Sequence, residues 1–469
     1  MPCSLWQLLS PCQLGRIVRH RRRNMARAAA ATLAALLSLA SYASALQLPV
    51  PRRRPSTTAR RAVGDETVGE PLDVVILQRS RSALTAVGYE LAASLAAQGC
   101  GVGVACDRDD ADAASLRALA GVEVATPKDG IGGYDDAVAK LFGRLGSDKP
   151  RAVCDLATRD GDGMGKRLAS ARDADAVRYA LVTDWSSQDA AAEPGAAVGN
   201  DVPLGDAEVV LAASSFKAGS VAVRAQAVLG ATACAESFRY GTHPLSYFFD
   251  RVARDVAIPL PGPGPRGGLP PQLLSVCRAE DAAAVVGAAV RADHAGHAAY
   301  NLGRVNAWDL EAATYTQLAR ASAHAAGADK LRVPLYVPHG DWRAKLRFPF
   351  SDAPYRLDAD ATRDAFPDLP ETPSASRDAA VAAGTPKAVY GAKRLKVDGE
   401  AVRAGVDEHV LFAAVRDAYA AYEAATAEGP APIGDGDAAL VKDGDALLGS
   451  LIFSGLPFHE DLAPPFVEN

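Results

Sequence analysis

Acidic residues are missing from the first 64 positions of this chain of 469 residues. Residues 1–63 hold eleven arginines, and the rest of the chain carries 39 basic and 56 acidic residues, a net charge of −17. An acidic protein repels nucleic acid except at a local basic patch. The composition therefore excludes a general, charge-driven affinity for nucleic acid, and any contact with RNA has to use such a patch.

A long apolar run is also missing from the N-terminal region. The run from Ala28 to Leu39 is too short to span a membrane, which takes roughly 20 apolar residues. It follows an arginine cluster and precedes Ala43-Ser44-Ala45, a small-residue cleavage pattern, and then a basic segment with Ser and Thr. We predict that residues 1–63 are a bipartite plastid presequence, a signal peptide followed by a transit peptide. The alternative is a plain secretory signal.

Cysteine pairs with metal-binding spacing do not occur. Two of the seven cysteines lie in the predicted presequence, and the other five are Cys100, Cys106, Cys154, Cys234 and Cys277. Five is an odd number, and most of these residues fall in apolar runs. They are expected to be buried thiols rather than a disulfide framework or a zinc site.

What is present from Pro71 onward is a repeated alternation of apolar strands and amphipathic helices. Strands are expected at 73–78, 102–106, 122–125, 152–156, 179–183 and 297–302, and helices at 86–98, 113–120, 134–145, 165–176, 279–291, 310–326 and 406–427. This alternation predicts a parallel sheet with right-handed crossovers. The predicted fold class is α/β, a Rossmann-like doubly wound parallel sheet with a smaller C-terminal α/β domain. The expected parts are the presequence, a Rossmann-like domain at 64–240, a smaller domain at 241–370, and a linker, helix and acidic tail at 371–469.

Glycine is missing from the turn after the first strand, which reads Arg79-Ser80-Arg81-Ser82-Ala83. Glycines in this turn let the backbone approach a pyrophosphate at the start of the next helix. Gly88 remains, at the place where helix and strand pack closely, and Asp107 ends the second strand, where an acid accepts a ribose hydroxyl. NAD(P) binding is therefore expected to be weakened. The candidate residues of this degenerate cofactor site are Gly88, Asp107, Ser186 and Ser187.

A tyrosine followed four positions later by lysine occurs nowhere in the chain. Short-chain dehydrogenases and their epimerase relatives use this pair, because the lysine lowers the tyrosine pKa and the phenol then moves a proton. The expected place of the helix that carries the pair is 214–230, which contains Phe216, Lys217 and Arg224 but no tyrosine. We predict that redox and epimerase chemistry is lost. The sequence assigns no catalytic residue.

Basic clusters supply the local patches that RNA binding needs. Residues 340–350 place Arg343, Lys345 and Arg347 at alternate positions between Trp342 and Phe348, so that a strand would present the three charges on one face. The alternative is the solvated face of an ordinary strand. A glycine-rich stretch at 160–166, DGDGMGK, resembles a phosphate loop but lacks its terminal residues, and we expect an ordinary loop there. The candidate RNA-binding residues are Arg79, Arg81, Arg343, Lys345 and Arg347.

The second half of the chain resembles a known family. SYFFDRVARDVAIPLPGPG at 246–264, the segment 298–327 and KLRFPFSDAPYRLDADATRDAF at 345–366 are similar to the chloroplast stem-loop-binding protein family, atypical members of the extended short-chain dehydrogenase (NAD-dependent epimerase/dehydratase) superfamily. The resemblance implies a Rossmann domain, a smaller C-terminal domain, a plastid location, RNA binding and, in some members, endoribonuclease activity. The family's Gly-Gly in the first turn is here Ser82-Ala83.

These observations together predict a plastid RNA-binding protein on an epimerase-like scaffold, involved in RNA stabilisation or processing. The alternative is an NAD(P)- or nucleotide-sugar-binding, epimerase/dehydratase-like enzyme or sensor. A divalent metal is expected only with nuclease activity, with Asp107 and Asp155 as its best ligands; otherwise no metal site is predicted. The expected partners are plastid transcripts, and a homo-oligomer or a ribonucleoprotein assembly fits the same reading.

Overall fold

The computed structural model describes residues 71–127, 133–146, 151–184, 188, 197–201, 203–253, 258–261, 273–292, 294, 296–302, 312–327, 335–337, 348–350, 355–367, 369, 395–397, 400–402 and 408–427. The predicted presequence lies outside this part of the chain. Among the described residues, no helix has the length and apolar character that a membrane crossing requires.

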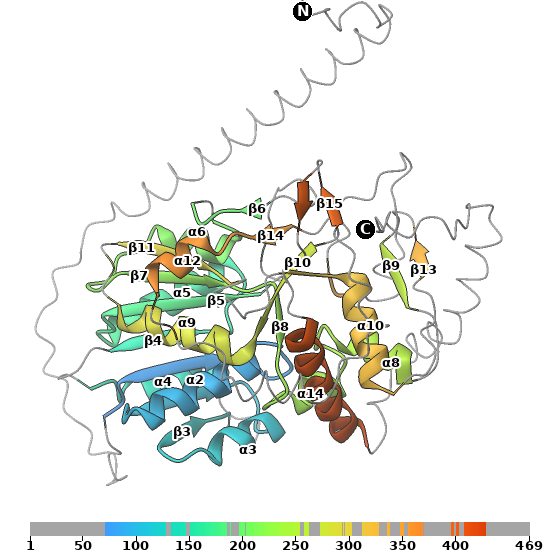
Figure 1. Cartoon of the computed structure of the whole chain (residues 1–469). Helices are drawn as coiled ribbons and strands as arrows, with labels where there is room; N and C mark the ends of the chain where they lie inside the picture. Colours follow the sequence, from blue (N-terminus) through green and yellow to red (C-terminus); the bar gives the residue numbers. More distant parts are fainter. Residues whose placement is uncertain are drawn as a thin grey trace, which may run out of the picture. The chain divides into compact units, whose positions relative to one another are not determined.

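Seven strands form the main sheet, in the order β11-β7-β5-β4-β1-β2-β3 (Figure 1). All neighbouring strands in it are parallel. The order runs outward from β1 in both directions, as in a doubly wound sheet, so the predicted α/β fold class is confirmed. The strands are β1 (Val74–Gln78), β2 (Val102–Cys106), β3 (Val122–Ala125), β4 (Ala152–Asp155), β5 (Arg178–Thr183), β7 (Ser220–Arg224) and β11 (His297–Asn301).

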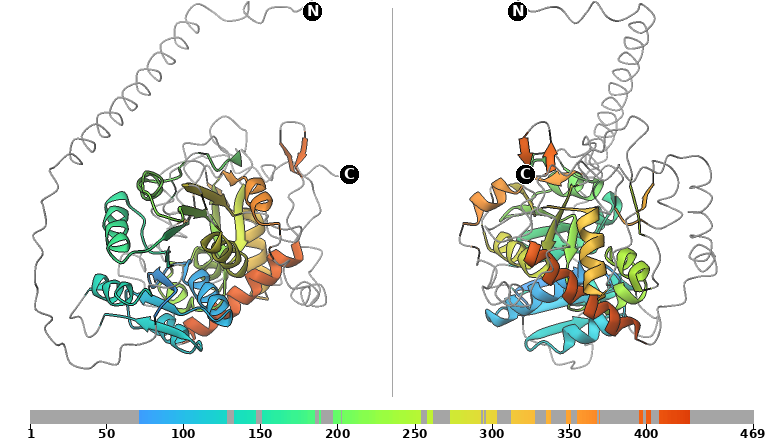
Figure 2. Two further views of the ribbon diagram at one scale, coloured as in Figure 1. Left: turned by 90° about the vertical axis from the view of Figure 1, so that its left-hand side faces the viewer. Right: turned by 45° about the vertical axis from the view of Figure 1, so that its right-hand side comes forward.

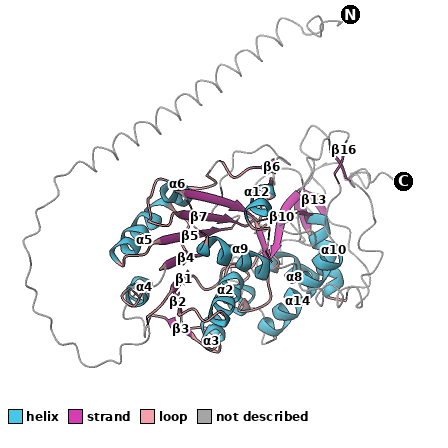
Figure 3. Cartoon of the chain, turned by 60° about the vertical axis from the view of Figure 1, so that its left-hand side comes forward, coloured by secondary structure: helices cyan, strands magenta, loops and turns pink. Residues whose placement is uncertain are grey.

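Helices cover both faces of this sheet, which explains why its inner strands are continuous apolar runs. Successive side chains of a strand point to opposite faces, so Val74 and Ile76 enter one core while Val75 and Leu77 enter the other. The two helical layers lie on either side of the sheet (Figure 3). The first consists of α2 (Thr85–Ala97), α3 (Ala111–Arg117) and α9 (Ala279–Arg291), and the second of α4 (Tyr134–Phe142), α5 (Gly161–Asp173) and α6 (Asp206–Ala212).

A smaller set of strands and helices packs beside the main sheet. β10 (Leu273–Arg278) pairs in parallel with β8 (Ala227–Leu229) and antiparallel with β12 (Ala312–Thr314). Three two-stranded pairs are β6 (Ala197–Val198) with β14 (Arg356–Leu357), β9 (Pro259–Pro261) with β13 (Leu335–Val337), and β15 (Leu395–Val397) with β16 (Glu400–Val402). The helices of this part are α7 (Ala235–Arg239), α8 (Ser246–Ala253), α10 (Tyr315–Ala325), α12 (Asp360–Ala365) and α14 (Glu408–Thr426).

Aromatic side chains hold α14 in place, the helix expected at 406–427 within the segment of linker, helix and acidic tail. Tyr419 and Tyr422 pack edge-on or tilted against Phe249 of α8, and the Tyr422 hydroxyl donates to Asp250 at 2.6 Å. The helix also contacts α7 and α10. It lies beside α10 in the right-hand view of Figure 2. The chain interleaves its two parts, because it leaves the main sheet after β7, builds β8 and β10, and returns through α9 to β11.

Two local predictions are wrong. Residues 214–230, the expected place of the catalytic helix, contain β7 and β8 instead, because the β-branched Val221 and Val223 are buried in the main sheet. The helix that precedes β7 is α6. The expected loop at 160–166 is the start of α5, capped by the Asp160 side chain, which accepts a hydrogen bond from the Gly163 N–H at 2.7 Å.

Candidate functional site

The carboxyl ends of β1 and β4 mark the switch point of this sheet, because the strand order reverses between them. Ligands of doubly wound folds bind in the crevice at that point. The neighbouring register places Gln78 beside Cys106 and Leu77 beside Asp155, so the turns after β1, β2 and β4 meet at one edge. The candidate site is therefore built from these three turns and the helices that follow them.

The turn after β1 is closed by an acid of the chain itself. The Ser80 N–H donates to Asp107 Oδ1 at 2.7 Å. A second acid, Asp112 at the start of α3, is buried beside the turn; it accepts the Glu236 N–H, and burial raises its pKa to about 7. In a dinucleotide site, N–H groups of this turn are donors to the pyrophosphate. The Asp107 carboxylate takes one of these donors here.

The start of α2 is covered as well. The Cys234 Sγ lies 3.6 Å from Thr85 Oγ1, and burial raises the pKa of that thiol to about 12. Thr85 and Ala86 are fully buried. A Cβ added at Gly230 would lie 2.6 Å from the Cβ of Ala86, so the segment that leads into α7 packs directly on the first turn of α2. The residues at the usual pyrophosphate position therefore do not fit an ordinary dinucleotide.

Replacing Gly230 by alanine tests this close packing. The new methyl group meets the Cβ atoms of Ala86 and Ala279, which cannot rotate away, so Gly230→Ala is expected to lower the free energy of unfolding by about 1–3 kcal/mol. Gly165→Ala is the matched control, because a Cβ there meets nothing within 4 Å and alanine stabilises a helix by roughly 0.5–1 kcal/mol relative to glycine. Urea denaturation measures both changes. Equal stability of the two variants would contradict the packing.

Two of the sequence-predicted residues lie where expected but have structural contacts. Gly88 lies where α2 approaches β1 closely, since a Cβ there would lie 2.1 Å from Gln78 Oε1. Asp107 reaches the first turn from the end of β2, but one carboxylate oxygen already binds Ser80. Arg81 has a left-handed backbone (φ 62°), and its guanidinium carbon lies 3.2 Å from the ring centroid of Tyr240, so its side chain is stacked on that ring.

Arg159, which the sequence analysis did not single out, connects two turns at the same edge. Its Nη2 donates to Ser82 Oγ at 3.2 Å and to Asp184 Oδ2 at 3.3 Å. Asp184 directly follows β5 and is almost fully buried. The guanidinium therefore crosses the carboxyl edge of the sheet from the turn after β1 to the end of β5. The only signal in the sequence was the position of each residue just past a buried strand.

A cavity of about 310 Å³ lies between α4 and α5, at the carboxyl ends of β1 and β4. Its lining combines an apolar part with a cationic part. The lining residues are Arg79, Tyr134, Asp135, Val138, Ala139, Ala157, Thr158, Asp160, Gly163, Lys166, Arg167 and Ser170. Of these, Arg79 alone was a candidate from the sequence; Lys166 lies in the stretch 160–166, whose likeness to a phosphate loop was the one available signal.

The charges of the cavity differ in how they are paired. Arg167 donates to Asp135 at 2.6 Å and lies over the Tyr134 ring at 4.8 Å. Arg79 and Lys166 form no ion pair within the described part of the chain. The Tyr134 hydroxyl is buried without a hydrogen-bond partner, and burial raises its pKa well above the ordinary value. The cavity is therefore lined by two cations that have no ion pair among the described residues.

Asp155, the other acid predicted as an ion ligand, is fully engaged at the end of β4. Its carboxylate accepts the N–H groups of Ala157 and Thr158 at 2.8 and 2.9 Å and the Tyr179 hydroxyl at 2.5 Å. Burial, with the charge of Asp155 beside it, raises the pKa of Tyr179 well above its ordinary value. Asp155 thus shapes the turn after β4. No group of three or more His, Cys, Asp or Glu residues within the described ranges is placed to hold a metal ion.

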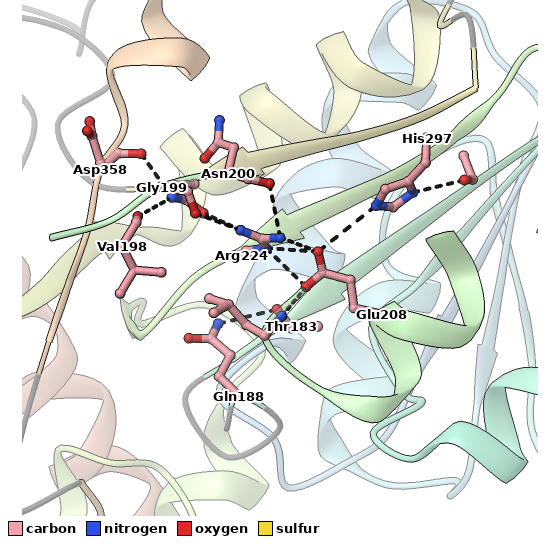
Figure 4. A network of polar contacts seen from close by, with 12 residues as sticks. Thr183, Gln188, Val198, Gly199, Asn200, Glu208, Arg224, His297 and Asp358 are labelled. Atoms are coloured by element: carbon pink, nitrogen blue, oxygen red, sulfur yellow. Dashed lines mark hydrogen bonds and ion pairs between the residues drawn. The ribbon is translucent and has the colours of Figure 1, made fainter. Parts of the chain in front are cut away.

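A buried polar network lies under α6, at the other side of the sheet edge (Figure 4). Glu208 and Arg224 form an ion pair in which both side chains are 1% exposed. Arg224 Nη1 also donates to the carbonyl of Gly199 at 3.1 Å, and Asn301 Nδ2 donates to the carbonyls of Val198 and Asp358 at 2.8 and 2.9 Å. The network therefore ties β6 and the residue after β14 to the main sheet, and its role is to join the two parts of the molecule.

Several predicted site residues lie outside the described part of the chain. They are Ser186, Ser187, Arg343, Lys345 and Arg347. Their proposed roles in cofactor and RNA binding stay predictions.

Comparisons with known proteins give structural likeness only. No family model matches the chain, and no curated protein sequence matches it. Among solved structures, the Bordetella bronchiseptica enzyme WbmH in complex with NAD+ has 16% identity and a TM-score of 0.46, over 64% of this chain and 94% of that chain. The UDP-glucose 4-epimerase of Thermotoga maritima with UDP-glucose has 13% identity and a TM-score of 0.43, over 62% of this chain and 91% of that chain. A short-chain dehydrogenase/reductase superfamily protein from Agrobacterium tumefaciens with bound NAD has 16% identity and a TM-score of 0.43, over 64% of this chain and 92% of that chain.

Similarities this weak assign no ligand to the present chain. The class that its own strand order and site define is a Rossmann-like, doubly wound α/β protein with a closed first turn. None of the comparisons bears on the resemblance to the chloroplast stem-loop-binding family.

Proposed function

We propose that this protein binds a phosphorylated ligand of the nucleotide class at the edge of its Rossmann-like sheet, without dehydrogenase or epimerase chemistry. The observation that carries the proposal is the cavity at the ends of β1 and β4, which brings Arg79 and Lys166 beside an apolar wall. Pockets at switch points of such sheets are the usual ligand sites, and charge-assisted hydrogen bonds from arginine and lysine are strong phosphate contacts.

The absence of the catalytic pair supports the second half of the proposal. No tyrosine in the sequence has a lysine four positions later. The helix before β7 instead places Glu208 in the buried pair with Arg224. This arrangement holds a charge in a structural contact, and α6 itself contains no tyrosine. A binding protein or sensor fits these residues better than an oxidoreductase.

Isothermal titration of the full chain with AMP, NAD+, NADP+ and UDP-glucose tests the proposed function. We expect saturable binding of at least one of them at a single site, and no turnover of NAD+ or UDP-glucose on prolonged incubation. If none of the four ligands bound, the result would contradict nucleotide binding. Appearance of NADH or of an epimerised sugar would contradict the loss of catalysis.

RNA binding remains the other hypothesis, from the sequence alone. The basic stretch 343–347 lies outside the described residues. Fluorescence anisotropy of a labelled stem-loop RNA, at several salt concentrations, separates this reading from the first, because phosphate contacts make affinity fall steeply with salt. The plastid location stays a prediction as well, and import of a fluorescent fusion would test it.

A further inference from the structure

We propose that the cavity between α4 and α5 takes a nucleoside monophosphate rather than a dinucleotide or a nucleotide-sugar, with its phosphate held by Arg79 and Lys166. This inference rests on the proposed function and names the ligand of the same site. It depends on four features of the described residues: the charge balance of the cavity, its apolar wall, its size and the closure of the neighbouring turn.

The charge balance points to one phosphate group. Three cations and two acids line the cavity. The ion pair of Arg167 with Asp135 neutralises one charge of each sign, and the carboxylate of Asp160 caps α5 by accepting the Gly163 N–H. Arg79 and Lys166 are left, and they come from the turn after β1 and from the second turn of α5. Two cations from different elements can hold one phosphate from two sides. They form a local basic site in a chain whose residues 64–469 carry a net charge of −17.

The glycines at the start of α5 favour the same reading. Gly161, Gly163 and Gly165 lie within the first five residues of the helix, where each costs roughly 0.5–1 kcal/mol relative to alanine. Gly163 lines the cavity and adds no side chain to it. The helix N-terminus also favours a negative charge nearby. Its contribution is secondary here, because the Asp160 carboxylate already uses one of its N–H groups.

The opposite wall suits a base and a sugar. Val138, Ala139 and Ala157 line it, and the Arg167 guanidinium lies over the Tyr134 ring at 4.8 Å. A base and a sugar would cover this wall. Inorganic phosphate would use the cations alone and leave the wall uncovered.

Size and closure exclude the larger nucleotides. About 310 Å³ is at the low end of the roughly 300–1,000 Å³ found for ligand pockets. A dinucleotide would have to continue along the carboxyl edge of the sheet, and that edge is filled where Arg159 joins Ser82 to Asp184. The start of α2 is filled by Cys234. The ligand therefore ends within the cavity.

Calorimetric titration of the full chain with AMP and UMP, and with NAD+, UDP-glucose and inorganic phosphate for comparison, tests the inference. The variants are Arg79→Gln and Lys166→Gln. The matched control is Lys140→Gln, an exposed lysine of α4 that does not line the cavity. Each cavity variant is expected to weaken monophosphate binding about tenfold or more, and the control less than about twofold. Ala139→Trp, at an exposed helix position on the cavity lining, is expected to abolish binding without unfolding the protein.

The outcomes separate this inference from the proposed function. Nucleotide binding that is unchanged in Arg79→Gln, Lys166→Gln and Ala139→Trp would overturn the cavity as the site while leaving nucleotide binding itself in place. Tighter binding of NAD+ or UDP-glucose than of AMP and UMP would overturn the choice of a monophosphate. Equal affinity for inorganic phosphate would overturn the role of the apolar wall. If none of these ligands bound to the wild-type protein, both proposals would be overturned.

Discussion

Arg224→Met is expected to lower the free energy of unfolding by about 3–5 kcal/mol, the largest single effect at the site. The substitution leaves the Glu208 carboxylate, which is 1% exposed, without its cation. His297 Nε2 lies 4.0 Å from Glu208 Oε1, but burial lowers the pKa of His297 in the wild type, so Arg224 is the cation that pairs with Glu208 there. Urea denaturation followed by circular dichroism measures the loss.

The control for this prediction removes both charges. Glu208→Leu combined with Arg224→Met leaves no unpaired ion, so the double variant is expected to be more stable than Arg224→Met alone. Asp109→Asn breaks the exposed pair with Arg117 and is expected to cost less than about 1 kcal/mol. If Arg224→Met were no more costly than Asp109→Asn, the buried pair would not be the connection between the two parts that the geometry indicates.

Asp112→Asn is expected to stabilise the protein at alkaline pH and to have little effect at pH 4. Burial raises the pKa of Asp112 from 3.8 to about 7 in the folded chain. Between these two values the folded state binds more protons than the unfolded state, so the free energy of unfolding falls as the pH rises from about 4 to about 7. Above that window Asp112 is ionised in the folded state, and this lowers the free energy of unfolding by up to about 4 kcal/mol. Asparagine carries no charge, and its side-chain oxygen still accepts the Glu236 N–H.

Urea denaturation at pH 4, 5, 6, 7 and 8 for the wild type and Asp112→Asn checks this prediction. The difference between the two should grow with pH across the window and then level off. Asp162→Asn, an exposed acid in the first turn of α5, is the control and should give no such growth. Parallel stability curves for wild type and Asp112→Asn would show that Asp112 is ionised in the folded protein and that its place beside the first turn is not a low-dielectric one.

The main sheet was largely predictable because its signals are local. The strands at Val102–Cys106 and Val122–Ala125 and the helix at Ala279–Arg291 have the predicted bounds. Each is a short apolar run or an amphipathic period bounded by polar residues, and their alternation determines a parallel order. The helix expected at 214–230 was predicted wrongly because the local signal there is ambiguous. A run of alanines and valines with few polar residues fits a buried strand as well as a buried helix.

The candidate site was less predictable, because its members come together only through the fold. Arg79 was found from its place in the first turn. Tyr134, Lys166 and Arg167 were not, since nothing in the sequence shows that α4 and α5 enclose a cavity. The sequence predicts that the degenerate turn binds a dinucleotide weakly, and it left open what occupies the turn.

What the sequence by itself determined is the α/β class, the missing tyrosine–lysine pair and the lack of glycine in the first turn, because each depends on neighbouring residues or on a fixed spacing. What only the tertiary structure decided is the occupant of that turn. Thr85 meets Cys234 across 149 positions of sequence, and Asp112 meets Glu236 across 124. Such contacts depend on how the return of the chain through β7 and α7 packs on α2 and α3, and hydrophobic burial fixes that packing without leaving a local pattern.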